Sequence, residues 1–376
     1  MATSPVHLLW LTENYPPARG GMAQSCDRIT HGLRTKNIIV HIIHFNNRKA
    51  PFKTDILING TYSAIPVSDN EAHTANLCWN FIRQMSYPFG KIVAFGGFLP
   101  LLTGPVFSKW LNIPLVTLFR GNDFDTAVFS PRRNILLKEA MLTSVAVGCV
   151  TRDQFQKVQN LFPGAPAWYL PNGINMEDWK IFPSEGKFAN DWRIKLKNKI
   201  CLGVFGQVKE KKGIEVLLNV LRKPGNSERF FLLVAGDYDD SLVNLLSESG
   251  IEHLLLPFLD RNELIKYYAA CDAVVIPSYY DGMPNVLLEA GALGIPVIGS
   301  SVGGMNDVLV KFKDDLLFYP GDGDQLESLL YKFSNKSKKE KELLGQTLRD
   351  HIAENYNEEN ELKPYIEIFN YDTKKS

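Results

Sequence analysis

Short apolar runs rich in β-branched residues recur along the whole chain, and segments with a helical pattern separate them. Continuous apolar strands joined by helical crossovers are typical of parallel sheets that helices cover on both faces. The runs fall into two series, at 7–11, 38–45, 92–95, 114–119 and 145–150 in the first half and at 200–205, 230–235, 254–258, 273–277 and 296–299 in the second. We therefore predict an α/β protein with two doubly wound, Rossmann-like parallel-sheet domains.

A chain of 376 residues is too long for one ordinary core and suits two domains. A turn signal at 171–173 and a polar, Lys-rich stretch at 182–198 separate the two series of apolar runs. The predicted domains are 1–180 and 181–355, with a separate C-terminal segment at 356–376. In open parallel sheets, ligands bind at the carboxyl ends of the strands, so motifs that follow the apolar runs are the candidate sites.

The composition disfavours several classes of protein. Basic and acidic residues number 41 each, so no global field favours nucleic acid as a partner. The N-terminus lacks a signal-peptide pattern, and no apolar stretch approaches the roughly 18 residues that a membrane span needs. The five cysteines are widely spaced without a CxxC pair, which favours buried thiols in a cytoplasmic protein. The Lys-rich run 336–341 favours a solvated helix surface, with contact to an anionic membrane as the alternative.

Two adjacent glycines lie between the first apolar run and the first helical pattern. Gly20 and Gly21 let the backbone approach a ligand closely, and a helix start supplies N–H donors with partial positive charge. That combination suits a diphosphate, and a tight turn without a ligand is the alternative. The three spaced glycines of the dinucleotide fingerprint are absent.

A cation, a glycine and an acid follow the run 114–119. Arg120 and Asp123 flank a Gly-Asn pair there, which indicates a ligand site, with a turn that carries an exposed ion pair as the alternative. Asp123 also begins a DxD triplet, a pattern found in metal-dependent transferases. Two further DxD triplets occur at 237–239 and 322–324, and no His/Cys cluster has metal-ligand spacing, so we predict no metal site.

The first apolar run of the second half leads into a turn and a basic residue. Gly206 and Gln207 follow the run, and the Lys212-Gly213 pair stands at the start of the next helical pattern. There Lys212 would meet a phosphate as a point charge beside helix N–H groups. A surface lysine without a ligand is the alternative.

The strongest motif follows the run 273–277. Asp281 lies on a loop, a helix begins near Pro284, and Glu289 lies about one and a half turns into that helix. A carboxylate accepts two hydroxyl hydrogen bonds at once, so two such groups suit a sugar ring and a ribose. N–H groups near Met283 and Asn285 would face the phosphates between them. An amphipathic helix with a polar start is the alternative, and it accounts for less of this constellation.

As a set, these motifs resemble glycosyltransferase family four, a group of retaining enzymes with the GT-B fold. The resemblance is local in the first half and nearly continuous over 200–322. It rests on Gly20-Gly21, Arg120-Gly-Asn-Asp, Asn172-Gly-Ile-Asn, Gly206 with Lys212-Gly213, Val234-Ala-Gly-Asp, the motif from Asp281 to Ala290, Val302-Gly-Gly and Pro320-Gly-Asp. It implies two Rossmann-like domains that face each other across a cleft, an acceptor-side first domain, a donor-binding second domain, and a C-terminal helix that crosses back to the first.

The resemblance also implies roles for the two acids and for a basic pair. In the family, the first acid of the motif contacts the sugar and the second contacts the ribose. Glu289 matches the second, and Asp281 stands in place of the usual first Glu. Lys212 matches the Lys of the pair that binds the diphosphate, whereas Gln207 stands where its Arg is expected.

Arg120 is a further departure, because the family usually carries a His before the Gly at this point. We hypothesise that Arg120, or Arg19 in the glycine loop, supplies the positive charge that is missing at Gln207. On this hypothesis Arg120→Ala abolishes transfer, and Gln207→Arg is tolerated.

The predicted function is metal-independent transfer of a sugar from a UDP- or GDP-linked donor to an acceptor hydroxyl, with retained anomeric configuration and no cofactor beyond the nucleotide sugar. Predicted catalytic residues are Arg120, Lys212 and Asp281. Predicted donor-binding residues are Gly20, Gly21, Asp123, Gly206, Gln207, Lys212, Phe258, Leu259, Asp281, Gly282, Met283, Pro284, Asn285 and Glu289, with Phe258 and Leu259 near the base.

The acceptor stays open among a glycan, a lipid-linked glycan, a metabolite and a macromolecule, and the chain is expected to be a monomer or a homodimer. Two alternative functions remain. One is a catalytically inactive nucleotide-binding protein of the same fold, which donor turnover would distinguish. The other is a different enzyme on the same fold, such as a sugar-nucleotide epimerase, which product analysis would distinguish.

Overall fold

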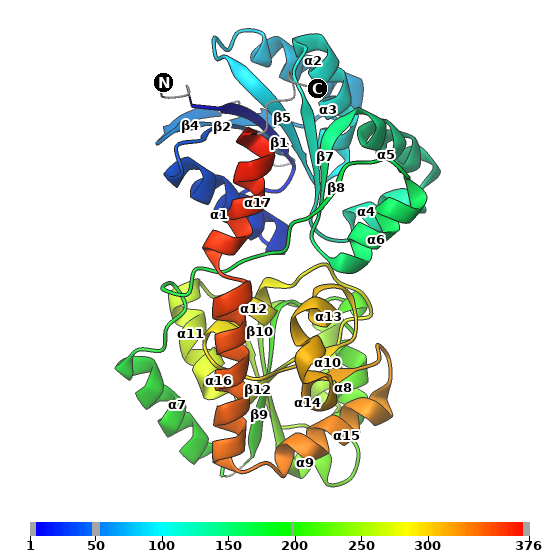
Figure 1. Ribbon diagram of the computed structural model, residues 1–376. Coiled ribbons are helices and arrows are strands. Elements are labelled where there is room, and N and C mark those ends of the chain that lie inside the picture. Colours follow the sequence, from blue (N-terminus) through cyan, green and yellow to red (C-terminus); the bar gives the residue numbers. More distant parts are fainter. Residues whose placement is uncertain (1–4, 47–52, 198, 371–376) are drawn as a thin grey trace. The chain divides into compact units, whose positions relative to one another are not determined.

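The computed structural model describes residues 5–46, 53–197 and 199–370. The chain divides into two compact units. Unit 1 comprises Met1–Asn172 together with Glu359–Ser376, and unit 2 comprises Gly173–Glu358 (Figure 1). The chain thus leaves unit 1 directly after Asn172, within the predicted turn signal, and the predicted boundary at residue 180 falls inside unit 2.

Unit 1 contains an eight-stranded sheet in the order β3-β4-β2-β1-β5-β6-β7-β8. Every neighbouring pair is parallel except β3 and β4. The strands are β1 (His7–Thr12), β2 (Ile39–Asn46), β3 (Lys53–Leu57), β4 (Gly60–Pro66), β5 (Phe89–Phe95), β6 (Leu115–Phe119), β7 (Ser144–Cys149) and β8 (Ala167–Tyr169). The helices are α1 (Gly21–Thr35), α2 (Glu71–Ile82), α3 (Phe98–Leu111), α4 (Asp123–Val128), α5 (Pro131–Thr143), α6 (Arg152–Leu161) and α17 (Glu358–Asn370).

Unit 2 contains a six-stranded parallel sheet in the order β11-β10-β9-β12-β13-β14. The strands are β9 (Ile200–Gln207), β10 (Phe230–Asp237), β11 (His253–Leu256), β12 (Ala273–Ile276), β13 (Val297–Ser300) and β14 (Leu317–Phe318). The α-helices are α7 (Pro183–Lys195), α8 (Ile214–Leu221), α9 (Asn226–Arg229), α10 (Asp240–Ser247), α11 (Arg261–Ala270), α12 (Asn285–Ala292), α13 (Gly303–Leu309), α14 (Lys313–Leu316), α15 (Gly323–Ser334) and α16 (Lys338–Asn355), and the 3₁₀ helices are η1 (Glu210–Lys212) and η2 (Val310–Phe312).

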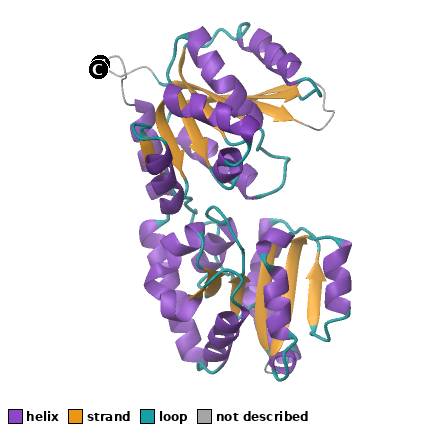
Figure 2. Cartoon of the chain, turned by 90° about the vertical axis from the view of Figure 1, so that its right-hand side faces the viewer, coloured by secondary structure: helices purple, strands orange, loops and turns teal. Residues whose placement is uncertain are grey.

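Both sheets have the strand order of a doubly wound fold. In unit 1 the order reverses between β1 and β5, and in unit 2 it reverses between β9 and β12. Ligands of such sheets bind outside the carboxyl ends of the strands at these switch points. In each unit, helices lie on the two faces of the strands (Figure 2). The predicted pair of doubly wound, parallel-sheet domains is therefore confirmed.

The sequence prediction missed four strands. These are β3 and β4, which form the antiparallel hairpin at the edge of unit 1, and the short strands β8 and β14. The hairpin turns at Asn59-Gly60, where both residues have positive φ angles, 56° and 150°. An Asn-Gly pair between two runs of alternating residues is a hairpin signal, and it would have located β3 and β4.

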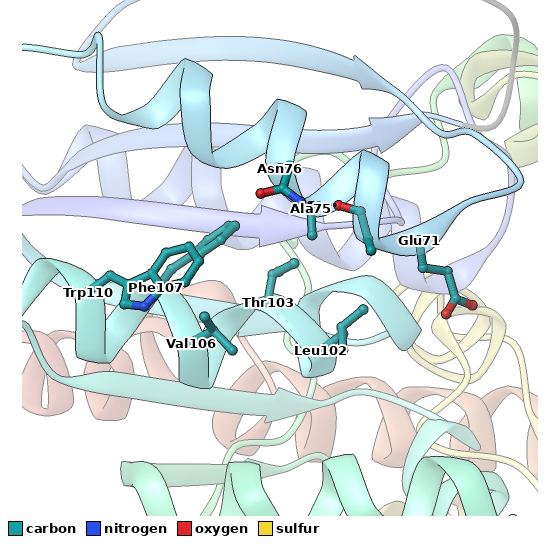
Figure 3. A pocket seen from close by; sticks show the side chains of 9 residues that line it. Glu71, Ala75, Asn76, Leu102, Thr103, Val106, Phe107 and Trp110 are labelled. Carbon is teal, nitrogen blue, oxygen red and sulfur yellow. Dashed lines mark hydrogen bonds between the residues drawn. The ribbon is translucent and has the colours of Figure 1, made fainter.

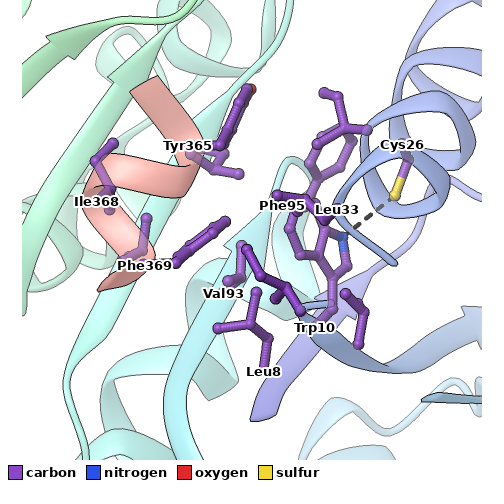
Figure 4. Close-up of a cluster of buried hydrophobic side chains, with 14 of the residues drawn as sticks. Leu8, Trp10, Cys26, Leu33, Val93, Phe95, Tyr365, Ile368 and Phe369 are labelled. Atoms are coloured by element: carbon purple, nitrogen blue, oxygen red, sulfur yellow. Dashed lines mark hydrogen bonds between the residues drawn. The ribbon is translucent and has the colours of Figure 1, made fainter. Parts of the chain in front are cut away.

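Helix α17 is part of the core of unit 1, although it follows unit 2 in the chain. Trp10 on β1 lies 5.6 Å from the Phe95 ring of β5 and 6.4 Å from the Phe369 ring of α17, measured between ring centroids (Figure 4). All three side chains are buried. At Gly32 of α1, an added Cβ would lie 2.6 Å from Leu362 of α17, so the two helices approach closely because this residue is glycine. Segment 356–376 thus contains the helix that packs back onto unit 1.

Candidate functional site

The turn after β9 carries the predicted phosphate-binding lysine and packs against the end of β12. Gly213 ends η1 with a φ of 64°, and a Cβ at this position would lie 2.1 Å from the Pro277 carbonyl oxygen. Only glycine fits this approach without a shift of the backbone. The Tyr279 N–H also donates to the Lys211 carbonyl at 3.0 Å. The lysine turn and the loop after β12 are therefore held together at the switch point of unit 2.

Lys212 and Asp281 form an ion pair at this point. The Lys212 ammonium also donates a hydrogen bond to Asp281 Oδ2, and the side chains are 27% and 16% exposed. The other carboxylate oxygen, Oδ1, accepts from the Gly282 N–H at 3.0 Å. The pair is thus partly accessible to solvent and polar ligands, and it joins the two charged residues that the sequence assigned to a phosphate and a sugar.

A second loop supports Asp281 from the side of β13. Gly303 has a φ of 46°, and a Cβ there would lie 2.1 Å from the Asp281 carbonyl oxygen. The Gly304 N–H donates to the Gly282 carbonyl at 2.7 Å. These contacts give a structural reason for the Gly-Gly pair that follows Val302, and they hold the Asp281 loop in place.

Helix α12 starts beside this loop. Pro284 is its N-cap residue, and no side-chain oxygen caps the start of the helix. The partial positive charge of a helix start is therefore not offset by a capping group, which suits an anion. The Met283 and Asn285 side chains are buried, at 3% and 9% exposure, so their predicted contribution would come from the backbone.

Glu289 lies further along α12 and is 9% exposed. The Tyr268 hydroxyl of α11 donates to Glu289 Oε2 at 2.8 Å. This tyrosine was not predicted as a site residue, since a tyrosine in a helical pattern is typical of a core position. No local spacing signal links it to Glu289.

The remaining predicted donor residues of unit 2 lie at the ends of β9 and β11. Gly206 and Gln207 are the last residues of β9, and Gly206 has a φ of 95°. Phe258 and Leu259 lie in the loop between β11 and α11, and the Phe258 side chain is 41% exposed. All of these residues lie at the carboxyl ends of strands, as predicted for a ligand site of this sheet.

In unit 1, the glycine pair begins α1 as expected. Gly20 is the N-cap residue with a φ of 120°, Gly21 is the first helical residue, and no side chain caps the helix. The start of α1 therefore has the conformation predicted for an anion-binding loop.

Arg120 has a different environment from the one its predicted role requires. Its side chain is 1% exposed, and its guanidinium donates to the Leu170 carbonyl at 2.6 Å, to the Tyr365 hydroxyl at 2.8 Å and to Asn172 Oδ1. Its Nη2 also lies 3.7 Å from Glu361 Oε1. The charge is thus used to join α17 to the rest of unit 1. This packing argues against Arg120 as the cation that compensates for Gln207, and also against the exposed ion pair considered as the alternative.

Asp123 is likewise satisfied within its own turn. Its carboxylate accepts from the N–H groups of Arg120, Gly121 and Phe124 at 3.0–3.2 Å. Burial raises the pKa of Asp123, and these backbone hydrogen bonds lower it. These hydrogen bonds give Asp123 a structural role in its turn. Its contact with the donor stays a prediction.

One apolar pocket of about 340 Å³ lies between α2 and α3 of unit 1 (Figure 3). Leu102, Val106, Phe107 and Trp110 line it from α3, and no predicted site residue lines it. Among the described residues, no three His, Cys, Asp or Glu side chains gather where they would hold a metal ion. No helix within the described ranges combines the length and the apolar character that a bilayer span requires.

Comparison with protein families connects the unit 2 site to a known group. Residues 187–349, less than half of the chain, match the family described as glycosyl transferases group 1. An uncharacterized glycosyltransferase of Methanocaldococcus jannaschii is 32% identical over 174 residues, covering 45% of this chain and 43% of that protein. A D-inositol 3-phosphate glycosyltransferase of Saccharomonospora viridis is 30% identical over 170 residues, covering 42% and 39%. The chain thus matches less than half the length of these two relatives.

Solved structures share the fold over nearly the whole chain. Sucrose-phosphate synthase from Thermosynechococcus elongatus has a TM-score of 0.82 at 17% identity, covering 97% of this chain and 98% of that one. Anabaena HepE in complex with UDP and glucose has a TM-score of 0.77 at 17% identity, covering 96% and 99%. At these identities the likeness shows the fold alone, and it confirms the predicted GT-B class.

Proposed function

We propose that this protein is a glycosyltransferase that takes its sugar from a nucleoside-diphosphate donor bound to unit 2. The observation that carries the proposal is the grouping of Lys212, Asp281 and the uncapped start of α12 at the switch point between β9 and β12. A cation, a helix start and a carboxylate are the groups that a sugar diphosphate requires. The family match over residues 187–349 covers this same part of the chain.

The Lys212–Asp281 pair suggests how the donor is engaged. A diphosphate carries more negative charge than one carboxylate, so it competes with Asp281 for the Lys212 ammonium. Asp281 then has a lone pair available for a sugar hydroxyl, while Lys212 and the start of α12 stabilise the charge that grows on the leaving diphosphate. Donor binding therefore exchanges one ion pair for two specific contacts.

We further propose that transfer retains the anomeric configuration, needs no metal and uses a UDP- or GDP-linked sugar. The positive charge of Lys212 and the dipole of α12 supply the electrostatic stabilisation that a metal supplies in other transferases. Structures of the fold neighbour HepE hold UDP and UDP-glucose, which supports a uridine nucleotide as the first donor to test.

The first experiment is thermal unfolding of the purified protein with UDP, GDP, ADP, UDP-glucose and GDP-mannose. A nucleotide at about a hundred times its Kd adds roughly 2.7 kcal/mol to the stability of the folded state, which gives a readable rise in Tm. We expect a rise with one base family, lost in Glu289→Ala. No rise with any nucleotide would refute the proposed donor site.

A nucleotide-binding protein without transferase activity is the second candidate. Two observations favour it. Gln207 stands where a basic residue is expected, and Arg120 is buried, so Arg120 does not replace the missing positive charge. Release of nucleoside diphosphate from the donor, measured with a panel of sugar and lipid-linked acceptors, separates the two candidates. Turnover supports the enzyme, and tight binding without turnover supports the second candidate.

A further inference from the structure

The buried Tyr268–Glu289 hydrogen bond contacts a predicted donor residue and has no role in the proposed mechanism. The Tyr268 hydroxyl lies 2.8 Å from Glu289 Oε2, and the bond joins α11 to α12. Tyr268 is fully buried, while Glu289 is 9% exposed. Hydrogen bonds to an ionised carboxylate are roughly twice as strong as those between neutral groups.

The surroundings of Tyr268 keep its hydroxyl protonated. Burial raises the pKa of the Tyr268 phenol well above its ordinary value, and the negative charge of Glu289 raises it further. The phenol is therefore protonated at neutral pH and serves as a hydrogen-bond donor. Its role is to hold the carboxylate rather than to transfer a proton.

The Tyr268 ring is fixed by two aromatic neighbours. The Phe205 ring lies 4.0 Å away between centroids, and the Trp179 ring meets it edge-on at 5.9 Å. Phe205 is on β9, directly before Gly206, so the strand that leads into the phosphate turn also sets the position of the tyrosine. A rigid ring with two neighbours fixes the direction of its hydroxyl, and hence the plane of the Glu289 carboxylate.

We infer that Tyr268 is a positioning residue that orients Glu289 toward the 2′- and 3′-hydroxyls of the bound nucleotide and so makes the site selective for ribose. This inference rests on the proposed function, because it takes the nucleotide to be the ligand of unit 2. A fixed donor on one carboxylate oxygen restrains the direction of the remaining lone pairs, which suits a pair of adjacent hydroxyls. An acid without that donor accepts hydrogen bonds in several geometries and loses this preference.

The experiment compares UDP and GDP with their 2′,3′-dideoxy counterparts by isothermal titration calorimetry. The variants are wild type, Tyr268→Phe and, as a matched control, Tyr267→Phe on the same helix. Tyr268→Phe keeps the ring against Phe205 and removes only the hydroxyl. We expect it to weaken binding of the ribose nucleotide about 10- to 100-fold and to leave the dideoxy affinity unchanged, while Tyr267→Phe behaves as wild type.

The outcomes separate this inference from the proposed function. Wild-type protein that binds none of the nucleotides overturns the proposed function, and the inference with it. Wild-type protein that prefers ribose, with the same preference in Tyr268→Phe, overturns the inference alone. Equal weakening of ribose and dideoxy binding in Tyr268→Phe also overturns it, because it shows a general packing role.

A second measurement covers the case in which Tyr268→Phe does not fold. Incorporation of 3-fluorotyrosine at position 268 keeps the hydroxyl and adds a fluorine NMR signal beside the carboxylate. We expect this signal to shift on addition of the ribose nucleotide and to shift much less with the dideoxy form. Equal shifts with both forms would contradict the positioning role.

Discussion

Both units place charged side chains at the carboxyl ends of their strands, but they use them differently. In unit 1 the Arg120 side chain is 1% exposed and its guanidinium is bonded inside the unit. In unit 2 the Lys212 and Asp281 side chains are 27% and 16% exposed and form an ion pair. A partly exposed ion pair can be opened by a ligand, whereas a buried network cannot be opened without loss of stability. A charged motif at a strand end is therefore a binding site only where its side chains stay accessible.

The largest expected effect is on the stability of unit 1. Arg120→Ala leaves Glu361 without one of its cationic neighbours and removes the hydrogen bonds to Asn172 and Tyr365. We expect the free energy of unfolding to fall by about 3–5 kcal/mol, measured by urea denaturation. The control is Arg261→Ala in unit 2, whose ion pair with Asp178 is exposed and is worth less than about 1 kcal/mol. If Arg120→Ala lowers the free energy of unfolding as little as the control does, the proposed difference between a buried network in unit 1 and an exposed pair in unit 2 is wrong.

The next effect is on the rate of transfer. Lys212→Ala removes the cation that we propose stabilises the leaving diphosphate, and we expect the rate to fall about 100- to 1000-fold, or about 2.7–4 kcal/mol, with little change in Tm. Lys211→Ala is the matched control, because the neighbouring ammonium lies 5.6 Å from the Tyr280 ring centroid rather than on Asp281. Steady-state kinetics with the donor identified by thermal unfolding measures both variants. Equal losses in the two would contradict a specific role for Lys212.

A smaller effect on stability tests the close approach of Gly213 to the Pro277 carbonyl, which positions the turn that carries Lys212. Gly213→Ala combines a positive φ with a Cβ only 2.1 Å from the Pro277 carbonyl oxygen. Gly225→Ala also has a positive φ, 83°, but no atom lies within 4 Å of the added Cβ. We expect losses in unfolding free energy of about 3 kcal/mol and about 1 kcal/mol respectively. Similar losses would mean that the backbone conformation alone, and not the contact with β12, sets the cost at Gly213.

The smallest expected effect is at Gln207. Gln207→Arg adds a charge at the end of β9, and we expect UDP or GDP binding to tighten by less than about 5-fold, or about 1 kcal/mol, with a stronger dependence on salt. Gln346→Arg adds the same charge on the exposed side of α16 and serves as the control for net charge. Titration calorimetry at two salt concentrations measures both variants. Binding lost in Gln207→Arg would show that an uncharged residue is required there.

The elements of the fold that depend on local pattern were predictable from the sequence. Continuous apolar runs located the central parallel strands of both sheets, since burial on both faces removes the alternation of polar residues. The hairpin of β3 and β4 was missed because its strands carry polar residues among the apolar ones and form no continuous apolar run. The two-residue strand β14 was missed because so short a segment has no period.

The candidate site was predictable only in part, for a physical reason. Gly213, Asp281 and Glu289 belong to the segments that come next in the chain after β9 and β12, so their positions near the strand ends follow from chain order. The environment of Arg120 depends on Tyr365 of α17, which lies 245 residues further along the chain. The partner of Glu289 is on another helix, 21 residues earlier, without a motif that joins them. Burial and long-range pairing of this kind come from tertiary packing, which spacing alone does not encode.

The place of α17 in the core of unit 1 has a consequence for the order in which the protein matures on the ribosome. Unit 2 is one continuous segment, Gly173–Glu358, and it is translated before α17. Unit 1 instead waits for Leu362, Tyr365 and Phe369, which are translated after all of unit 2. At about 5–20 residues per second that wait is roughly 10–40 s. During it, the face of the sheet around Trp10 lacks its covering helix, so nascent unit 1 exposes apolar surface that can aggregate.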